Sequence, residues 1–119
     1  MTRRTTNPDF LNGVPELIVL ELLSRQPMYG YELVQAIQAE SSGALAFGEG
    51  CIYPLLHRLE SQKLLESRRE TAGGRRRIVY RVTPAGRKKL AASVATWQEI
   101  VAGVSTVLQG GAHGRPAVA

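Results

Sequence analysis

Apolar residues recur at helical spacing in three segments of the first half of the chain. We expect helices over residues 14–24, 29–41 and 51–62. The first segment is apolar on most of its sides and should therefore be buried on most of them. The third is amphipathic, so one of its faces is free to meet a partner. Its apolar stripe consists of Ile52, Leu55, Leu56 and Leu59.

A period-two alternation replaces the helical pattern after the third segment. Two strands are expected over residues 65–70 and 77–82, with large apolar side chains at every other position of the second strand. The Gly-Gly pair at residues 73–74 supplies the positive φ angles that a tight hairpin requires. A helix followed by a hairpin with a basic tip is the layout of a winged helix. The expected fold class is therefore mainly α with a small β-hairpin.

The last segment predicts one long helix. Thr83 is a good N-cap and Pro84 suits the first helical position, and no further proline or Gly-Gly pair follows until residues 110–111. Such a helix is about 37 Å long, which is more than a core this small can cover. Its apolar positions recur at steps of 4, 3, 4, 3 and 4, as in a heptad seam, so we expect a homodimer joined along this seam. The seam consists of Leu90, Val94, Trp97, Val101, Val104 and Leu108.

With 119 residues, the chain is long enough for one compact domain and one additional element. We expect a flexible N-terminal arm over residues 1–13 and a winged helix-turn-helix domain over residues 14–83. A dimerisation helix over residues 84–109 and a disordered tail over residues 110–119 complete the expected organisation.

Positive charge is concentrated in the winged part of the chain. Residues 50–90 contain eleven Lys or Arg and three Glu, so 11 − 3 = +8, whereas the whole chain carries +5. This concentration favours a polyanionic partner. Nucleic acid is favoured over a membrane because no basic amphipathic helix shows a wide aromatic face. A membrane span is not expected either, since Pro15, Glu16 and Glu21 interrupt the most apolar run.

Other chemistries find little support in the sequence. The single cysteine, Cys51, excludes an internal disulfide, and no apolar core of a signal peptide follows Arg3 and Arg4, so we expect a cytoplasmic protein. Paired carboxylates and a Ser/His/Asp set are not apparent, and His57 and His113 have no partners at metal-ligand spacing. We therefore expect no enzyme activity, no cofactor and no metal.

Four motifs in order resemble the PadR family of bacterial transcriptional regulators. They are YGYEL at residues 29–33, EGCIYPLLHRLE at 49–60, GGRRR at 73–77 followed by Tyr80, and TPAGR at 83–87. The resemblance covers about residues 14–108. Only one helix is expected after the hairpin, and in this the chain is similar to the short subfamily that contains multidrug-sensing repressors. The resemblance implies a homodimeric winged-helix repressor that binds double-stranded DNA at a palindromic operator.

Residues at the start of the third helix and at the basic hairpin tip are candidate DNA contacts, because these parts of a winged helix meet the DNA. Each candidate also has a simpler explanation: the tyrosines and the proline as packing or bracing residues, and the charged groups as a solvated surface. Cys51 departs from the family, which often has Thr or Ser there, so a thiol stands where the resemblance implies a hydroxyl that contacts phosphate. The candidates are Tyr53, Pro54, His57 and Arg58 on the helix, Arg75, Arg76 and Arg77 at the hairpin, and Cys51 and Tyr29.

Trp97 occupies the middle of the expected seam, where a large ring by itself stabilises a dimer interface. In the multidrug-sensing members that the chain resembles, a tryptophan of this helix lines a cavity at the dimer interface and stacks on planar ligands. The resemblance therefore implies a small hydrophobic or phenolic effector held by Trp97, Val94 and Val101. A protein-interaction module that binds no specific DNA is the alternative, because some winged helices bind partner proteins.

Overall fold

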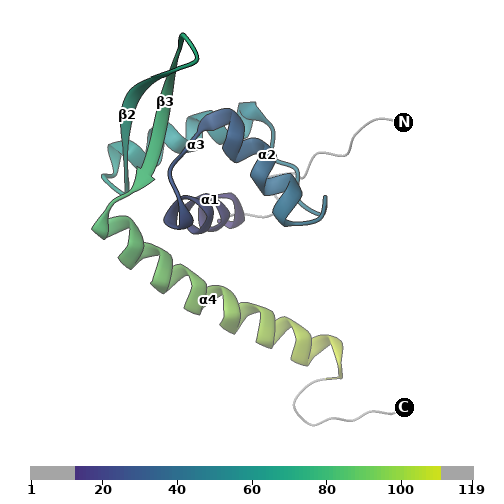
Figure 1. Ribbon diagram of the computed structural model, residues 1–119. Helices are drawn as coiled ribbons and strands as arrows, with labels where there is room; N and C mark the ends of the chain where they lie inside the picture. Colours follow the sequence, from purple (N-terminus) through teal and green to yellow (C-terminus); the bar gives the residue numbers. More distant parts are fainter. Residues whose placement is uncertain (1–12, 111–119) are drawn as a thin grey trace.

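The computed structural model describes residues 13–110. In chain order the elements are α1 (Val14–Arg25), β1 (Met28–Tyr29), α2 (Gly30–Glu40), α3 (Glu49–Ser61), β2 (Leu65–Ala72), β3 (Arg75–Val82) and α4 (Pro84–Leu108) (Figure 1). The expected class, mainly α with a small β part, is confirmed. The arm and the tail fall outside the described residues, apart from Gly13 before α1 and Gly110 after α4.

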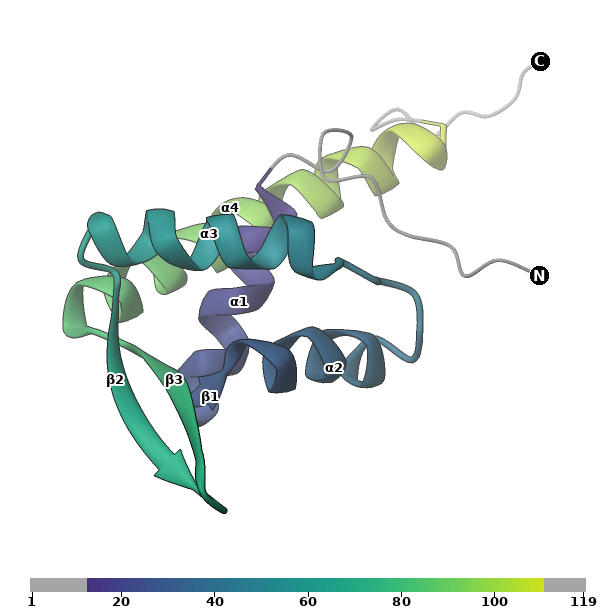
Figure 2. The same cartoon turned by 90° about the horizontal axis from the view of Figure 1, so that it is seen from above.

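The core is built around α1, which lies beneath α2 and α3 (Figure 1) and between them when seen from above (Figure 2). Every residue of α1 from Val14 to Ser24 is buried or half-buried, as its nearly continuous apolar pattern predicts. The loop before α3 is fixed to this core by Phe47, which is 1% exposed. Beside it the core contains Val19, Leu20, Leu23, Leu33, Ile37, the four stripe residues of α3, Leu65 and Tyr80.

The sheet has three antiparallel strands in the order β1-β3-β2. The hairpin β2–β3 turns at Gly73 and Gly74, whose φ angles of +58° and +79° confirm the expected tight turn. Because this turn continues the right-handed twist of the strands, pairing extends to Ala72 and Arg75. The second strand was expected to begin at Arg77, with Arg75 and Arg76 in the basic tip before it; this is wrong for Arg75 and Arg76, because β3 begins at Arg75.

Strand β1 has no counterpart among the expected elements. Met28 pairs with Tyr80 and Tyr29 pairs with Val79, so the segment after α1 pairs with β3, the second strand of the hairpin. Two residues are too few to show a period-two pattern. The hairpin is thus anchored at its base on two sides, by β1 and by α3.

The start of α4 is tightly joined to the base of the hairpin. The Thr83 hydroxyl accepts a hydrogen bond from the Gly86 N–H at 3.0 Å and donates one to the Lys63 carbonyl at 2.7 Å. The Thr83 N–H bonds to the Leu64 carbonyl at 3.1 Å. A Cβ on Gly86 would lie 2.1 Å from that carbonyl oxygen, so only glycine fits there. Thr83 as N-cap and Pro84 in the first turn are both confirmed.

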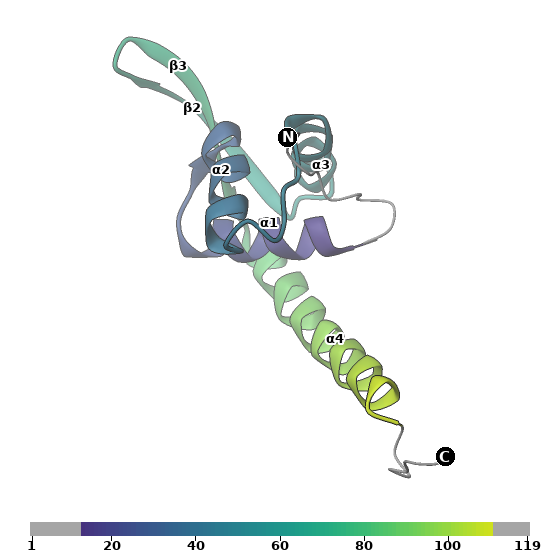
Figure 3. The same cartoon turned by 90° about the vertical axis from the view of Figure 1, so that its right-hand side faces the viewer.

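Beyond the part that lies beside α1, α4 leaves the rest of the molecule and its C-terminal turns extend alone (Figure 3). Leu90 is 9% exposed and belongs to the core of its own chain, and Val94 packs against that core. From Trp97 onward the apolar side chains are exposed, with Trp97 at 42% and Val104 at 52%. Within the described residues no helix combines the length and apolar character needed to cross a membrane.

Candidate nucleic-acid interface

The outward face of α3 is formed by residues opposite its buried stripe. Gly50, Pro54, His57 and Ser61 are all exposed and recur at steps of 4, 3 and 4, so they form one line along the helix. Pro54 has no N–H to donate to the Gly50 carbonyl, which leaves that oxygen without its usual helical partner. This line is an exposed face of α3, and it contains two of the expected contacts, Pro54 and His57.

Tyr53 lies beside this line, toward α2 and the hairpin. It is half-buried against Gly30, where a Cβ would come within 2.5 Å of its ring. Burial, and then the nearby Glu49 charge, raise the pKa of the Tyr53 phenol. Tyr53 therefore braces α3 against the start of α2. Its remaining exposed part and His57 both line the groove between α3 and the hairpin that is described below.

Cys51 and Arg58 lie on the opposite flank, toward α1. The Cys51 thiol is half-buried and its pKa is raised by burial. The Arg58 side chain is ion-paired with Glu16 of α1 at 3.0 Å. Both residues border a hollow with Pro54 and Pro15, so they meet the outward line of α3 from its α1 side.

The hairpin, rather than α3, carries the positive charge. From Glu49 to Ser61 there are two glutamates and one arginine, so 1 − 2 = −1. From Leu65 to Val82 there are six arginines and two glutamates, so 6 − 2 = +4. The hairpin and α3 both lie on the side of the molecule away from α4 (Figures 1 and 3). The positive charge on this side that could attract a phosphate group is thus mainly on the hairpin, while α3 presents a nearly neutral exposed face.

A groove of about 300 Å³ separates α3 from the hairpin. Tyr53 and His57 form its α3 side, and Arg76 and Ile78 form its hairpin side. Tyr29 lies at its base, and the Arg77 guanidinium is stacked over the Tyr29 ring, 4.4 Å from the ring centre. Five of the expected contacts therefore meet at this groove: Tyr29, Tyr53, His57, Arg76 and Arg77. Arg75 lies farther out, beside the turn.

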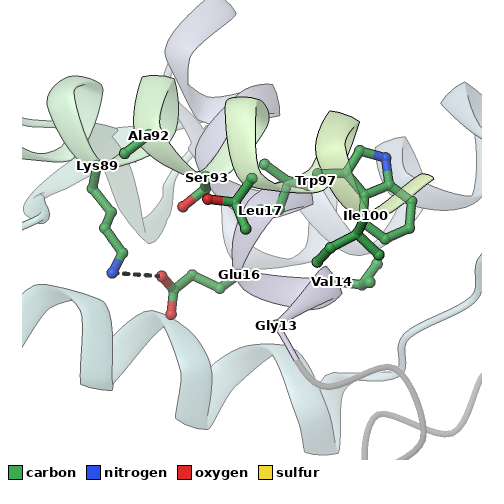
Figure 4. Close-up of a pocket in the computed structure, with 10 residues that line it drawn as sticks. Gly13, Val14, Glu16, Leu17, Lys89, Ala92, Ser93, Trp97 and Ile100 are labelled. Carbon is green, nitrogen blue, oxygen red and sulfur yellow. Dashed lines mark ion pairs between the residues drawn. The ribbon is translucent and has the colours of Figure 1, made fainter. Parts of the chain in front are cut away.

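A second groove, of about 600 Å³, runs between the start of α1 and the exposed part of α4 (Figure 4). Trp97 and Ile100 of α4 face Val14 of α1, and Lys89 is directed toward Glu16 at the other end. Val94 and Val101, which we expected beside Trp97 in an effector site, do not line this groove. Val94 packs instead against the core of its own chain, and Val101 is exposed.

Several residues of these surfaces were not among the expected contacts. Ser61 continues the outward line of α3, and a strict helical count would have found it. Arg69 is on the hairpin, and only the strand register shows which way it faces. Glu16 and Ile100 reach their grooves through packing of α1 on α3 and α4, for which a single sequence has no local signal.

Comparison with known proteins agrees with this geometry. Residues 19–92 match the family described as "Transcriptional regulator PadR-like family". A transcriptional regulator of Mycobacterium tuberculosis is 33% identical over 105 residues, which is 88% of this chain and 92% of that protein.

Solved structures give the same result. The crystal structure of a PadR family transcriptional regulator from Eggerthella lenta is similar with a TM-score of 0.75 and 33% identity, over 86% of this chain and 88% of that one. A PadR-like transcriptional regulator from Bacillus cereus has a TM-score of 0.74 and 32% identity, over 86% and 98% of the two chains.

Proposed function

Because the chain belongs to the PadR-like family of transcriptional regulators, a family of DNA-binding proteins, we propose that it is a homodimeric repressor acting in the cytoplasm. The observation that carries this proposal is the pairing of a nearly neutral, exposed line on α3 with a hairpin of charge +4 on the same side of the molecule. The α3 line reads base edges in the major groove, and the hairpin binds the adjacent backbone or minor groove.

Dimerisation through α4 is supported by its exposed apolar stripe. Trp97, Ile100, Val101, Val104, Val107 and Leu108 are between 42% and 80% exposed in the single chain. A contiguous apolar surface of this kind marks an interaction site. A second copy of α4 covers the stripe and places two α3 helices at half-sites about one helical turn apart. We leave Leu90 out of this interface because it is buried in its own chain.

Regulation by a small molecule is supported by the groove beside Trp97. Its volume of about 600 Å³ and its apolar end at Val14, Trp97 and Ile100 suit a planar hydrophobic or phenolic compound. Such a ligand releases DNA only if it binds more tightly to the arrangement of subunits that does not fit the operator. The effector site that we propose therefore keeps Trp97 and replaces Val94 and Val101 by Val14 and Ile100.

A gel-shift titration with the DNA upstream of the chain's own gene tests DNA binding. We expect a specific complex whose affinity falls steeply as salt rises, because arginine–phosphate contacts release counterions. No complex at low salt would contradict the repressor and favour the protein-interaction alternative. For the effector, planar drugs and phenolic acids are titrated against Trp97 fluorescence and the gel shift together. Quenching without DNA release would reduce the groove to a passive binding site.

A further inference from the structure

We infer that the arginines of the hairpin have two separate roles: Arg69 and Arg76 contact the DNA backbone, whereas Arg77 is a positioning residue that fixes the hairpin through Tyr29. The inference rests on the proposed DNA-binding function. The net charge of the hairpin does not distinguish one arginine from another, whereas this inference gives each of these three arginines its own role in DNA binding.

The register of the hairpin places Arg69 and Arg76 on its inner face. At the base of this face, the Ser67 hydroxyl donates a hydrogen bond of 2.6 Å to the Glu60 carboxylate of α3. Side chains alternate along a strand, so Arg69, two residues beyond Ser67, faces the same way. On β3, Tyr80 points into the core, and Arg76, four residues before it, shares its face.

The inner face has unbalanced positive charge. Arg69 is directly opposite Ile78 and Arg76 is opposite Thr71, so neither has an acidic cross-strand partner. Ile78 lies between them on the same face and is 46% exposed. Arg69, Ile78 and Arg76 together form a surface with an apolar centre and two cationic edges. Such a surface suits the sugar and phosphate groups of a DNA strand.

The outer face is different because two of its four arginines are opposite glutamates, while Arg68 and Arg75 are opposite Val79 and Ala72. Arg77 pairs in register with Glu70, and Arg81 pairs with Glu66. Arg77 is also half-buried, with its guanidinium over the Tyr29 ring at 4.4 Å. A guanidinium held over an aromatic ring, on a strand position opposite a glutamate, has less to gain from a phosphate.

The contact between Arg77 and Tyr29 lies where it can set the angle of the hairpin. Strand β1 holds β3 through only two residue pairs, Met28 with Tyr80 and Tyr29 with Val79. Beyond that point the hairpin extends freely to its turn (Figure 2). Stacking of Arg77 on Tyr29 continues the β1–β3 contact by two residues toward the tip. It thereby holds Arg76 across the groove from His57.

Charge-neutral variants measured on a labelled duplex of the upstream DNA over a range of salt concentrations separate the two roles. For Arg69→Gln and Arg76→Gln we expect weaker binding and a slope of log affinity against log salt smaller by about one each. For Arg77→Gln we expect weaker binding with an unchanged slope. Arg68→Gln, an outer-face change opposite Val79, is the matched control and should leave the slope unchanged.

Two further comparisons test the positioning role. A lysine still neutralises a phosphate but stacks less well, so Arg76→Lys should keep most of the affinity while Arg77→Lys loses as much as Arg77→Gln. In a double-mutant cycle, Tyr29→Leu combined with Arg77→Gln should weaken binding no more than either change alone. Circular dichroism of each variant verifies that it is folded.

The outcomes distinguish this inference from the function on which it rests. If the unaltered protein shows no salt-dependent complex, the DNA-binding function fails and the inference with it. If the unaltered protein binds but Arg77→Gln lowers the salt slope as Arg76→Gln does, and adds independently to Tyr29→Leu, the division of roles is overturned while the function stands.

Discussion

Arg58 of α3 donates to the Glu16 carboxylate of α1, with 3.0 Å between Nη2 and Oε1. The second oxygen of the same carboxylate lies 4.0 Å from Nζ of Lys89 on α4 (Figure 4). One glutamate thus joins the proposed reading helix to the helix that carries the proposed interface. The Arg58 side chain is 53% exposed, so the pair contributes little to folding and a DNA phosphate can compete for the guanidinium.

Neutralising Glu16 should therefore strengthen DNA binding. For Glu16→Gln we expect a several-fold higher affinity and a salt slope larger by about one, because Arg58 is released to a phosphate. The free energy of unfolding in urea should change by less than about 1 kcal/mol. Glu21→Gln is the control, since Glu21 is also ion-paired on α1 but with Arg25. An equal gain from both changes would mean that only net charge matters.

Gly30 should be required for the position of Tyr53. Alanine is compatible with the backbone there, but its Cβ would lie 2.5 Å from the Tyr53 ring, so the flexible ring must move. We expect Gly30→Ala to lower DNA affinity at least about tenfold while costing only about 1–2 kcal/mol of stability. Gly48→Ala, at an exposed position with no atom within 4 Å of the added Cβ, is the control. Full DNA affinity in Gly30→Ala would show that Tyr53 has no role in binding.

The apolar stripe of α4 predicts that the free chain is a dimer. Val101 is 42% and Val104 is 52% exposed in the single chain, so aspartate there does not disturb the core. We expect Val101→Asp with Val104→Asp to give folded monomers in sedimentation analysis, with much weaker DNA binding. Ala102→Asp places the same charge on an exposed neighbouring position and should remain dimeric. A persistent dimer in the double variant would rule out this seam.

The helices were predictable from sequence because their apolar periods are local. The sequence-based ends of α1, α2 and α3 lie within two residues of the observed ones. What escaped prediction depends on contacts between distant parts of the chain. Strand β1 forms only because Met28 pairs with the distant Tyr80. The ion pair between Arg58 and Glu16 likewise joins residues that are 42 positions apart in the sequence. The triple-arginine motif identified the basic hairpin, but only the register separates the face of Arg76 from that of Arg77.

Cys51 should react slowly with alkylating reagents. Burial raises the pKa of its thiol, so the reactive thiolate is scarcer at neutral pH than in an unfolded chain. We expect iodoacetamide to modify the native protein more slowly than the urea-unfolded protein at pH 7, with the native rate increasing as pH rises. Cys51→Ser gives the background. A native rate equal to or above the unfolded one would contradict this and show that the folded protein activates the thiol.

The same shift has a consequence for stability. Because folding favours the protonated thiol, the contribution of Cys51 is fully present below the pKa of the unfolded thiol, about 8.5. It is lost as pH rises through the higher folded pKa. Urea unfolding of the native protein and of Cys51→Ser between neutral and alkaline pH gives this contribution as the difference between the two curves.

The joint between the hairpin and α4 leaves no room for a hinge. Thr83 is bonded on both sides, to Lys63 and Leu64 and to Gly86, and Gly86 lies directly against the Leu64 carbonyl. A rotation of α4 against its counterpart in a dimer therefore cannot be absorbed at residues 83–86. In the proposed dimer such a rotation would turn the hairpin together with α4, so a small angle at this joint would displace the tip at Gly73 and Gly74 by a much larger distance.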